Sequence, residues 1–328
     1  MTHSSSPWHR MGRVVAHAGA ALGLLFGSMA AQAQAPGLMQ VLAMPDSVNN
    51  RLVAFSAADG SLVNAELFAL AGGTPVHALG VGNEIWVSEQ VGDRVSRWGA
   101  DGSFLGQIGG GATGGLDNVR GMGVVGNTVY ITNAGAANGA PGAAVVMVST
   151  SGAAMGSFAT GTTSPSPFGV LAFQGGLLVT SSSANDDIHR YSLAGAPLGT
   201  FHNSTTLNFG QQMAIATNGD VLVAGFSSNN IVRLNAATGA VLTTYAAAGA
   251  RGVAQLGNGN VMWTSGAGAF VLNVNTGASS QVYSGGGRYL EVVSVVPEPA
   301  SVLLWAGGLL AVVVVAGAAR RRAGIRLA

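Results

Sequence analysis

Short runs of apolar residues, separated by polar turns that contain glycine, recur along the chain between residues 38 and 296. Six of these runs, among them RLVAFS, VVMVS and IVRLN, are followed by turns that end in glycine at positions 60, 102, 152, 195, 239 and 277. The intervals between these glycines are 42, 50, 43, 44 and 38 residues. Such an interval is the length of four short strands with their turns. The pattern therefore predicts a structural unit that is repeated six times.

Most units also repeat in their upstream half, where a run such as PVHALGV is followed by a tight GN turn and then by EIWVS. β-Branched and aromatic residues favour strands, and the short turn favours a hairpin. Six units of four strands hide their open sheet edges when they close into a ring. We therefore predict an all-β, six-bladed β-propeller over residues 38–296. The C-terminal strand, residues 288–296, is expected to close the ring by completing the first blade.

The two ends of the chain differ from this body. Residues 1–33 combine a basic start, an apolar stretch and a small-residue cleavage site, and so predict a signal peptide for export. Residues 302–319 carry no charge and are followed by Arg320, Arg321 and Arg322. As a helix this stretch would reach about 27 Å, close to the thickness of a bilayer's hydrocarbon core. It predicts a transmembrane helix whose arginines stay in the cytoplasm.

Pro297, Glu298 and Pro299 stand immediately before the apolar stretch. Two prolines fix an extended backbone, so the motif also serves as a stop before a helix. In this order, Pro-Glu-Pro, apolar span and arginine cluster, residues 297–322 resemble the PEP-CTERM sorting signal of Gram-negative bacteria. The resemblance implies a transient inner-membrane anchor with the body on the periplasmic side. It also implies a partner, the protease-transferase exosortase, that removes the anchor and passes the protein to the cell surface or the medium.

The segments GNEIWVSEQVGDRVSRWGADG and NGDVLVAGFSSNNIVRLNAATG resemble the NHL and Vgb-like lyase propellers. This resemblance covers most of residues 38–296 at the level of the blade pattern and implies the fold. It assigns no chemistry, because propellers host many functions. The body contains only three histidines, His77, His189 and His202, and none can be matched to the lyases' histidine and glutamate.

Composition narrows the function classes. Charged residues make up only 8% of the chain and lysine is absent, so the body has no electrostatic support for binding nucleic acid. The absence of cysteine excludes disulfides and cysteine-based zinc sites. No G-x-S-x-G, H-E-x-x-H or P-loop pattern occurs, and the two G-x-G-x-x-G strings do not open a helix after a strand. An enzyme is therefore left open but is not favoured.

Aligning the starts of the predicted innermost strands places one residue of each blade at the mouth of the central channel. We expect these six to form a ligand-binding ring: His77, Arg120, Phe168, Gln212, Arg251 and Tyr289. Arginine forks grip carboxylates in a bidentate manner and aromatic faces stack on the apolar faces of sugars, which suits an acidic polysaccharide. The alternative is that the arginines pair with neighbouring carboxylates or cap carbonyl groups.

Oxygen-bearing side chains are predicted on the same face: Asp46, Asn49, Asn50, Glu89, Asp93, Asn133, Asn185, Asp186, Asp187, Asn229 and Asn230. Glu84 is considered together with them as a further oxygen ligand. They could bind calcium or, in an enzyme, magnesium. More often such residues form turns by bonding their own backbone, and no calcium-loop motif is present. No cofactor or metal is therefore assigned.

Together these observations favour an exported, surface-sorted propeller that binds a component of the extracellular matrix or the envelope, such as an acidic exopolysaccharide of a biofilm. One alternative is a metal-dependent lyase or lactonase that acts at the channel mouth. The other is a structural matrix protein with no small ligand.

Overall fold

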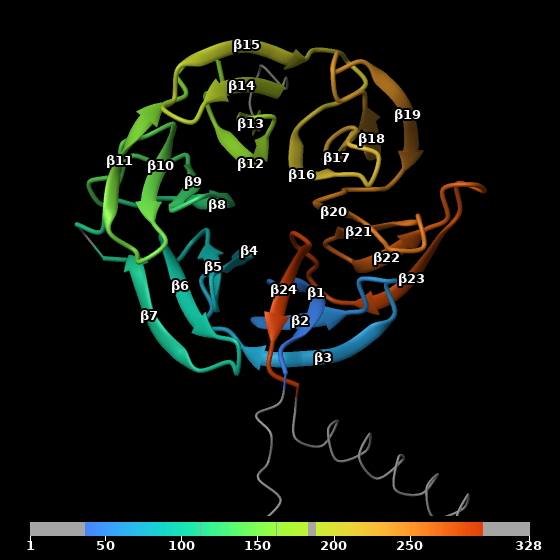
Figure 1. Ribbon diagram of the computed structural model, residues 1–328, viewed down its shortest axis with the longest axis horizontal. Coiled ribbons are helices and arrows are strands. Elements are labelled where there is room, and N and C mark those ends of the chain that lie inside the picture. Colours follow the sequence, from blue (N-terminus) through green and yellow to red (C-terminus); the bar gives the residue numbers. More distant parts are fainter. Residues whose placement is uncertain (1–36, 112, 162, 183–187, 298–328) are drawn as a thin grey trace, which may run out of the picture. The chain divides into compact units, whose positions relative to one another are not determined.

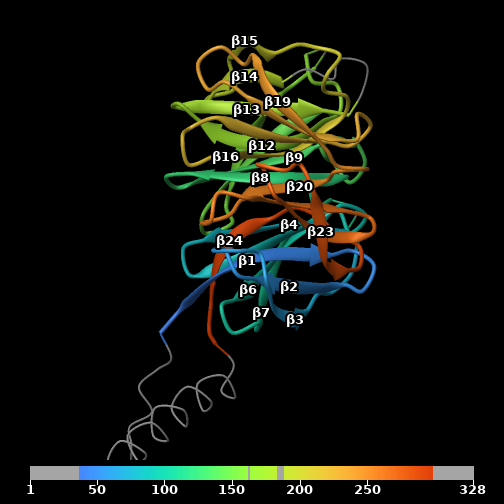
Figure 2. The same ribbon diagram turned by 90° about the vertical axis from the view of Figure 1, so that its right-hand side faces the viewer.

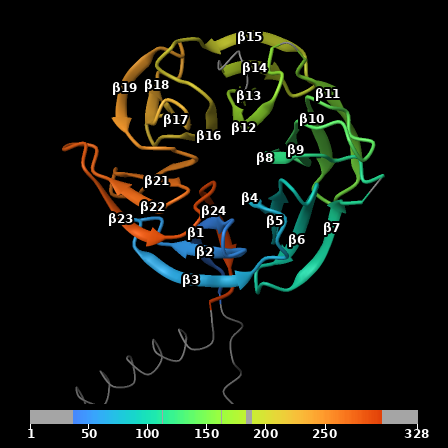
Figure 3. The same cartoon turned by 180° about the vertical axis from the view of Figure 1, so that it is seen from behind.

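In the computed structural model the described residues are 37–111, 113–161, 163–182 and 188–297. They form six four-stranded antiparallel sheets arranged around a common axis, seen from the two faces in Figures 1 and 3. This confirms the six-bladed propeller. Within these residues there is no helix, and so none that could cross a bilayer. The predicted signal peptide and membrane span lie outside them.

Each blade runs from an innermost to an outermost strand. The innermost strands are β24 (Glu291–Val295), β4 (Pro75–Val81), β8 (Val119–Val125), β12 (Pro167–Phe173), β16 (Gly210–Ile215) and β20 (Gly252–Gln255). The second strands are β1 (Met39–Asp46), β5 (Glu84–Glu89), β9 (Thr128–Asn133), β13 (Gly176–Ser181), β17 (Val221–Gly225) and β21 (Val261–Ser265). The third strands are β2 (Arg51–Phe55), β6 (Arg94–Gly99), β10 (Ala144–Ser149), β14 (Ile188–Ser192), β18 (Asn230–Leu234) and β22 (Gly268–Leu272). The outermost strands are β3 (Leu62–Ala69), β7 (Phe104–Gly109), β11 (Ala154–Ala159), β15 (Pro197–His202), β19 (Val241–Ala246) and β23 (Ser279–Ser284).

The first blade has the order β24-β1-β2-β3, so the last strand of the chain supplies its innermost position. Met39 pairs with Val295 and Ala43 with Glu291. The predicted closure is confirmed, although the strand begins at Glu291 rather than at residue 288. The preceding residues instead lead over the channel, held by a bridge between Asp46 and Gly287.

The hydrophobic core is divided among the blade interfaces. Val41 and Ala43 pack toward the second blade, whereas the alternating Leu42 and Met44 pack toward the sixth. Successive side chains of a strand point to opposite faces of its sheet. A strand whose sheet packs between two neighbouring blades must therefore be apolar on both faces. That requirement explains the nearly continuous apolar sequence of second strands such as Val221–Gly225.

The predicted turn glycines connect the third and outermost strands. All six, at positions 60, 102, 152, 195, 239 and 277, have positive φ angles between 68° and 92°. Glycine adopts this left-handed region without the steric cost that a side chain adds. The spacing that predicted the blades therefore has a backbone cause.

Hydroxyl groups link neighbouring blades near the axis. Thr132 of β9 donates to the carbonyl of Phe168 at 2.7 Å, and Thr180 of β13 donates to the carbonyl of Gln211 at 3.1 Å. Ser88 and Thr264 make the equivalent bonds to the carbonyls of Arg120 and Arg288. These buried bonds fix the backbone that carries the residues around the channel.

The two faces of the disc differ. On one face, which we call the mouth face, the loops between second and third strands contact the loops that lead into the innermost strands. The hydrogen bond from Gln90 N to Thr74 O is one such contact. The opposite one, the far face, carries the remaining turns. Because Met39 pairs with Val295, both described ends of the chain leave at the far face, as Figure 2 shows in blue and red.

Candidate functional site

Four of the other five predicted ring residues lie around Tyr289. Its ring lies 5.3 Å from the ring of His77 and 6.4 Å from that of Phe168 between centroids. Arg120 lies 4.4 Å from the centre of the Phe168 ring, and Gln212 lines the same cavity as Tyr289. The alignment of innermost strands therefore located a real cluster of side chains on the axis.

Arg120 is buried, with 7% of its surface exposed. Its Nη1 donates to Ser166 Oγ at 3.0 Å and to the carbonyl of Pro167 at 3.1 Å. Burial lowers the pKa of Arg120 to about 10, so it stays charged at neutral pH. Its carbonyl-capping bonds match the structural role that the sequence left open, but no described carboxylate pairs with it.

Arg251 lies beside the Phe226 ring, 5.7 Å from its centre. Its Nε is buried without a hydrogen-bond partner, and none of the described carboxylates is within ion-pair distance. Burial lowers the pKa of this guanidinium as well. The side chain is half-buried, so its remaining donors are accessible from the mouth face.

Arg288 was not among the predicted residues. Its Nε donates to Ser47 Oγ at 2.9 Å, and it too lacks an ion pair with any carboxylate in the described part of the chain. Burial, and then the nearby charge of Arg251, lower the pKa of Arg288 to about 10. A signal was present in the sequence, because Arg288 directly precedes Tyr289.

The Tyr289 hydroxyl is the polar centre of this cluster. Only 2% of Tyr289 is exposed, and its hydroxyl has no hydrogen-bond partner among the residues that the structure describes. Burial raises the pKa of Tyr289 well above 10, against the opposing influence of Arg120 and Arg288. Val76, Phe168 and Tyr289 form one buried apolar cluster. Arg120 and Arg288 thus lie near a neutral, apolar cluster rather than an acidic one.

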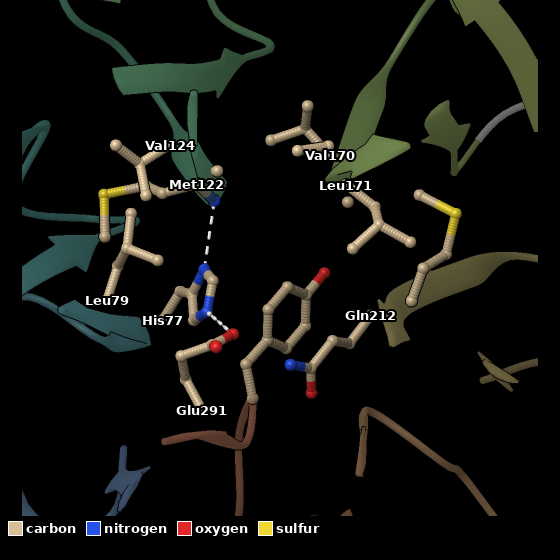
Figure 4. Close-up of a pocket in the computed structure, with 13 residues that line it drawn as sticks. His77, Leu79, Met122, Val124, Val170, Leu171, Gln212 and Glu291 are labelled. Carbon is tan, nitrogen blue, oxygen red and sulfur yellow. Dashed lines mark hydrogen bonds and ion pairs between the residues drawn. The ribbon is translucent and has the colours of Figure 1, made fainter. Parts of the chain in front are cut away.

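A cavity of about 160 Å³ extends from Tyr289 along the innermost strands toward the far face. Figure 4 shows His77 between Met122 and Glu291 at this cavity. His77 Nδ1 accepts the amide hydrogen of Met122 at 3.0 Å, which leaves the proton on Nε2, 3.5 Å from Glu291 Oε2. The histidine is therefore held in one tautomer by the neighbouring blade.

Gln212 also bonds to neighbouring backbone. Its Oε1 accepts from the amides of Val253 at 2.9 Å and Leu290 at 2.8 Å, and its Nε2 donates to the carbonyl of Leu290 at 2.5 Å. These bonds connect the fifth and sixth blades with the segment that leads into the first, so they join three blades that follow one another around the axis. Its role as a ligand contact stays a prediction, with one amide hydrogen left for it.

The predicted oxygen-rich residues are mostly engaged with the protein. Asp46 Oδ1 accepts the amides of Val48, Asn49 and Gly286, and Glu89 Oε2 accepts from Arg94 Nε at 2.6 Å. Among the described residues no three His, Asp or Glu side chains lie close enough to hold a metal ion. Asn185, Asp186 and Asp187 lie outside the described residues.

No family model matches this chain, and no curated protein matches it. Solved structures do share the fold. A protein of unknown function from Bacteroides caccae is 17% identical, with 78% of this chain and 98% of that chain covered and a TM-score of 0.58. The nidogen/laminin complex gives 12% identity, 77% and 98% coverage and a TM-score of 0.62. Streptogramin B lyase gives 14% identity, 75% and 88% coverage and a TM-score of 0.52. At these identities the likeness shows the β-propeller fold, which resembles that of Vgb-like propellers, and nothing about chemistry.

Proposed function

We propose that this propeller binds the carboxylate groups of an acidic polysaccharide at its mouth face. The observation that carries the proposal is the group of Arg120, Arg251 and Arg288, which share the mouth without a described carboxylate partner. Burying a guanidinium without a counter-charge is costly, and an incoming anion recovers part of that cost. Hydrogen bonds between arginine and carboxylate are charge-assisted and can be bidentate.

The surroundings of the arginines suit a sugar. Phe209 and Phe226 pack edge to face 5.2 Å apart beside Arg251, and both are only partly buried. Aromatic faces of this kind stack on the apolar faces of sugar rings, while the arginines hold the acid group. The mouth therefore combines the two kinds of contact that a uronic acid offers.

The test is a calorimetric titration of the purified protein with a uronic-acid oligomer, with a neutral hexose oligomer as the ligand control. Arg251→Gln and Arg288→Gln should each weaken binding about tenfold, because each removes a charge-assisted hydrogen bond. Arg190→Gln is the matched protein control, because Arg190 donates to Gln174 away from the mouth and its loss changes the net charge equally. Equal binding by all three variants and the original chain would contradict the proposal.

A second function, a metal-dependent lyase or lactonase, is favoured by one observation: His77 Nε2 and Glu291 Oε2 lie 3.5 Å apart at the wall of the cavity. Stoichiometric calcium or magnesium in the purified protein would support it. A full glycan array without a hit would instead favour the third alternative, a structural matrix protein.

We further propose that the chain is exported by residues 1–33 and anchored through residues 302–319 until exosortase acts near Pro297. Mass spectrometry of the surface-associated protein should then find a C-terminus close to Pro297. A surface form that retains the arginines at 320–322 would refute the sorting step.

A further inference from the structure

The outermost strands carry a repeated irregularity in their first halves. In β7 the pairing moves from Trp98↔Phe104 to Arg97↔Gly106, so Leu105 has no partner in the ladder. The same shift leaves one residue unpaired in four other blades. The five residues are Val63, Leu105, Met155, Leu198 and Leu242.

These five unpaired residues are all apolar and between 48% and 59% exposed. A β-bulge of this kind redirects a side chain and is a built feature of a sheet rather than a defect. The sixth blade lacks the feature, because Ser280 pairs in register with Val271. Five aliphatic side chains are thus directed into solvent at equivalent places around the ring.

The bulges lie near the far face. In the first blade Leu62 pairs with Phe55, Phe55 with Leu42, and Leu42 with Val292, so this row crosses the whole blade at one level. Val292, at the axial end of the row, is 43% exposed. It also lines a cavity of about 310 Å³ toward the far end of the channel, whose lining is mostly apolar but includes Gln255 and Glu291. The far face therefore presents apolar side chains both at its rim and at its centre.

The ring geometry indicates the kind of partner. Equivalent positions of blades around one axis lie near a common plane, so a flat surface reaches all five bulges at once, whereas a peptide reaches one or two. Only residues 297–301 separate the propeller from the apolar stretch at 302–319. Fully extended, these five residues span at most about 18 Å. This argument rests on the proposed membrane span.

We propose that, while the chain is anchored, the far face lies on the bilayer surface and inserts the five bulged residues into the interface. Charges on this face do not favour anionic headgroups, because Asp59 and Asp101 are exposed in its turns. Of the three arginines at this level of the third strands, two are paired with carboxylates, and Arg190 donates to Gln174. Arg97 pairs with Glu84 and Arg233 with Asp220. The contact is therefore apolar, it forms on zwitterionic lipid, and it directs the arginine mouth away from the membrane.

The test uses the full chain, which has no native cysteine, in phosphatidylcholine vesicles. Leu105→Cys and Val91→Cys place a polarity-sensitive fluorophore on opposite faces of the same blade, at positions 51% and 72% exposed. Lipids with brominated acyl chains should quench the label at 105 and leave the label at 91 unchanged. Equal quenching at both positions, or none at either while the protein floats with the vesicles, would overturn the contact.

A second variant adds Val63→Ser, Met155→Ser, Leu198→Ser and Leu242→Ser to the labelled Leu105→Cys chain. These exposed substitutions should preserve folding and flotation but lose the lipid quenching, because the face is no longer held to the bilayer. Unchanged quenching would refute the role of the bulges. A protein that does not float with the vesicles would refute both the proposed membrane span at 302–319 and the lipid contact of the far face. It would not bear on uronic-acid binding, which is measured in a separate titration. The label at 105 could instead be protected from solvent in a way that depends on protein concentration and not on lipid. That result would show that the far face contacts a second copy of the chain, and it would refute the contact with the bilayer.

Discussion

Asp46 joins the first blade to the sixth through hydrogen bonds, and replacing it tests how much this closure of the ring contributes to stability. The carboxylate lies in the first blade, fully buried, and accepts the hydroxyl of Tyr283 at 2.6 Å and the amide of Gly286 at 3.0 Å from the sixth. Asn49 Nδ2 donates to the same oxygen as Tyr283, at 2.7 Å, and Arg51 Nε lies 3.7 Å from it. One side chain thus connects residues about 240 positions apart.

The magnitude follows from the pKa of Asp46. Burial alone would raise this pKa, but the hydrogen bonds from Tyr283, Asn49 and Gly286 outweigh it and lower the pKa from 3.8 to about 2. A carboxylate stabilised to this extent contributes about 2 to 3 kcal/mol to the free energy of unfolding. Because the folded pKa is the lower one, the contribution is complete above about pH 4 and is lost as the pH falls toward about 2.

Asp46→Asn should remove this contribution. The amide oxygen can keep the backbone donors, but the amide nitrogen would then face Asn49 Nδ2 and Arg51, which are donors themselves. Urea unfolding of the full chain in mild detergent, followed by intrinsic fluorescence, measures the difference at several pH values. We expect the variant to be less stable by about 2 to 3 kcal/mol at neutral pH, with the difference shrinking below about pH 4.

Asp59→Asn is the matched control, because Asp59 accepts only local bonds in an exposed turn and its loss changes the net charge equally. The control should stay within about 0.5 kcal/mol of the original chain. An Asp46→Asn variant that behaves like this control, or a difference independent of pH, would refute the assignment of Asp46 as the closing residue.

Three other outcomes are expected. Gly239→Ala should destabilise the protein by more than about 2 kcal/mol in the same assay, because a Cβ there would stand 1.7 Å from the Phe201 carbonyl oxygen. Gly277→Ala, with a similar φ but open space, should cost only about 1 kcal/mol, and equal losses would contradict the packing argument. Thr132→Val should cost about 1 to 3 kcal/mol by leaving the buried Phe168 carbonyl without its donor, and an unchanged urea midpoint would show that this bond is dispensable. Uronic-acid binding should weaken as salt is added, since the exposed parts of the arginine site are screened, and a salt-independent affinity would point to apolar contacts instead.

Much of the fold could be predicted from local chemistry. The turn glycines needed a left-handed backbone, and their spacing gave the blades and the number of strands in each. Closure by the last strand followed from a chain that begins with three strands and ends with one. These features depend on short stretches of sequence, where the choice of residue and the backbone shape are directly linked.

The side-chain network around the axis could be predicted less well from the sequence. One position per blade was chosen for the ring, so Arg288 was passed over in favour of Tyr289 beside it. The bonds that commit Gln212 to Val253 and Leu290 join different blades, and no local pattern encodes their geometry. Leu105 looks like an ordinary strand residue in SFLGQI, and only the register of pairing with β6 shows that it is bulged.

The placement of β24 in the first blade also sets the order in which the protein can be completed. Strands β1 to β3 are synthesised first but keep an open inner edge until residues 291–295 have emerged. Until then the nascent propeller is an unclosed arc with the edge of β1 available for wrong pairing. On the proposed export route, the final strand arrives only a few residues ahead of the proposed membrane span at 302–319. Translocation would then stop at nearly the same moment as the ring is completed.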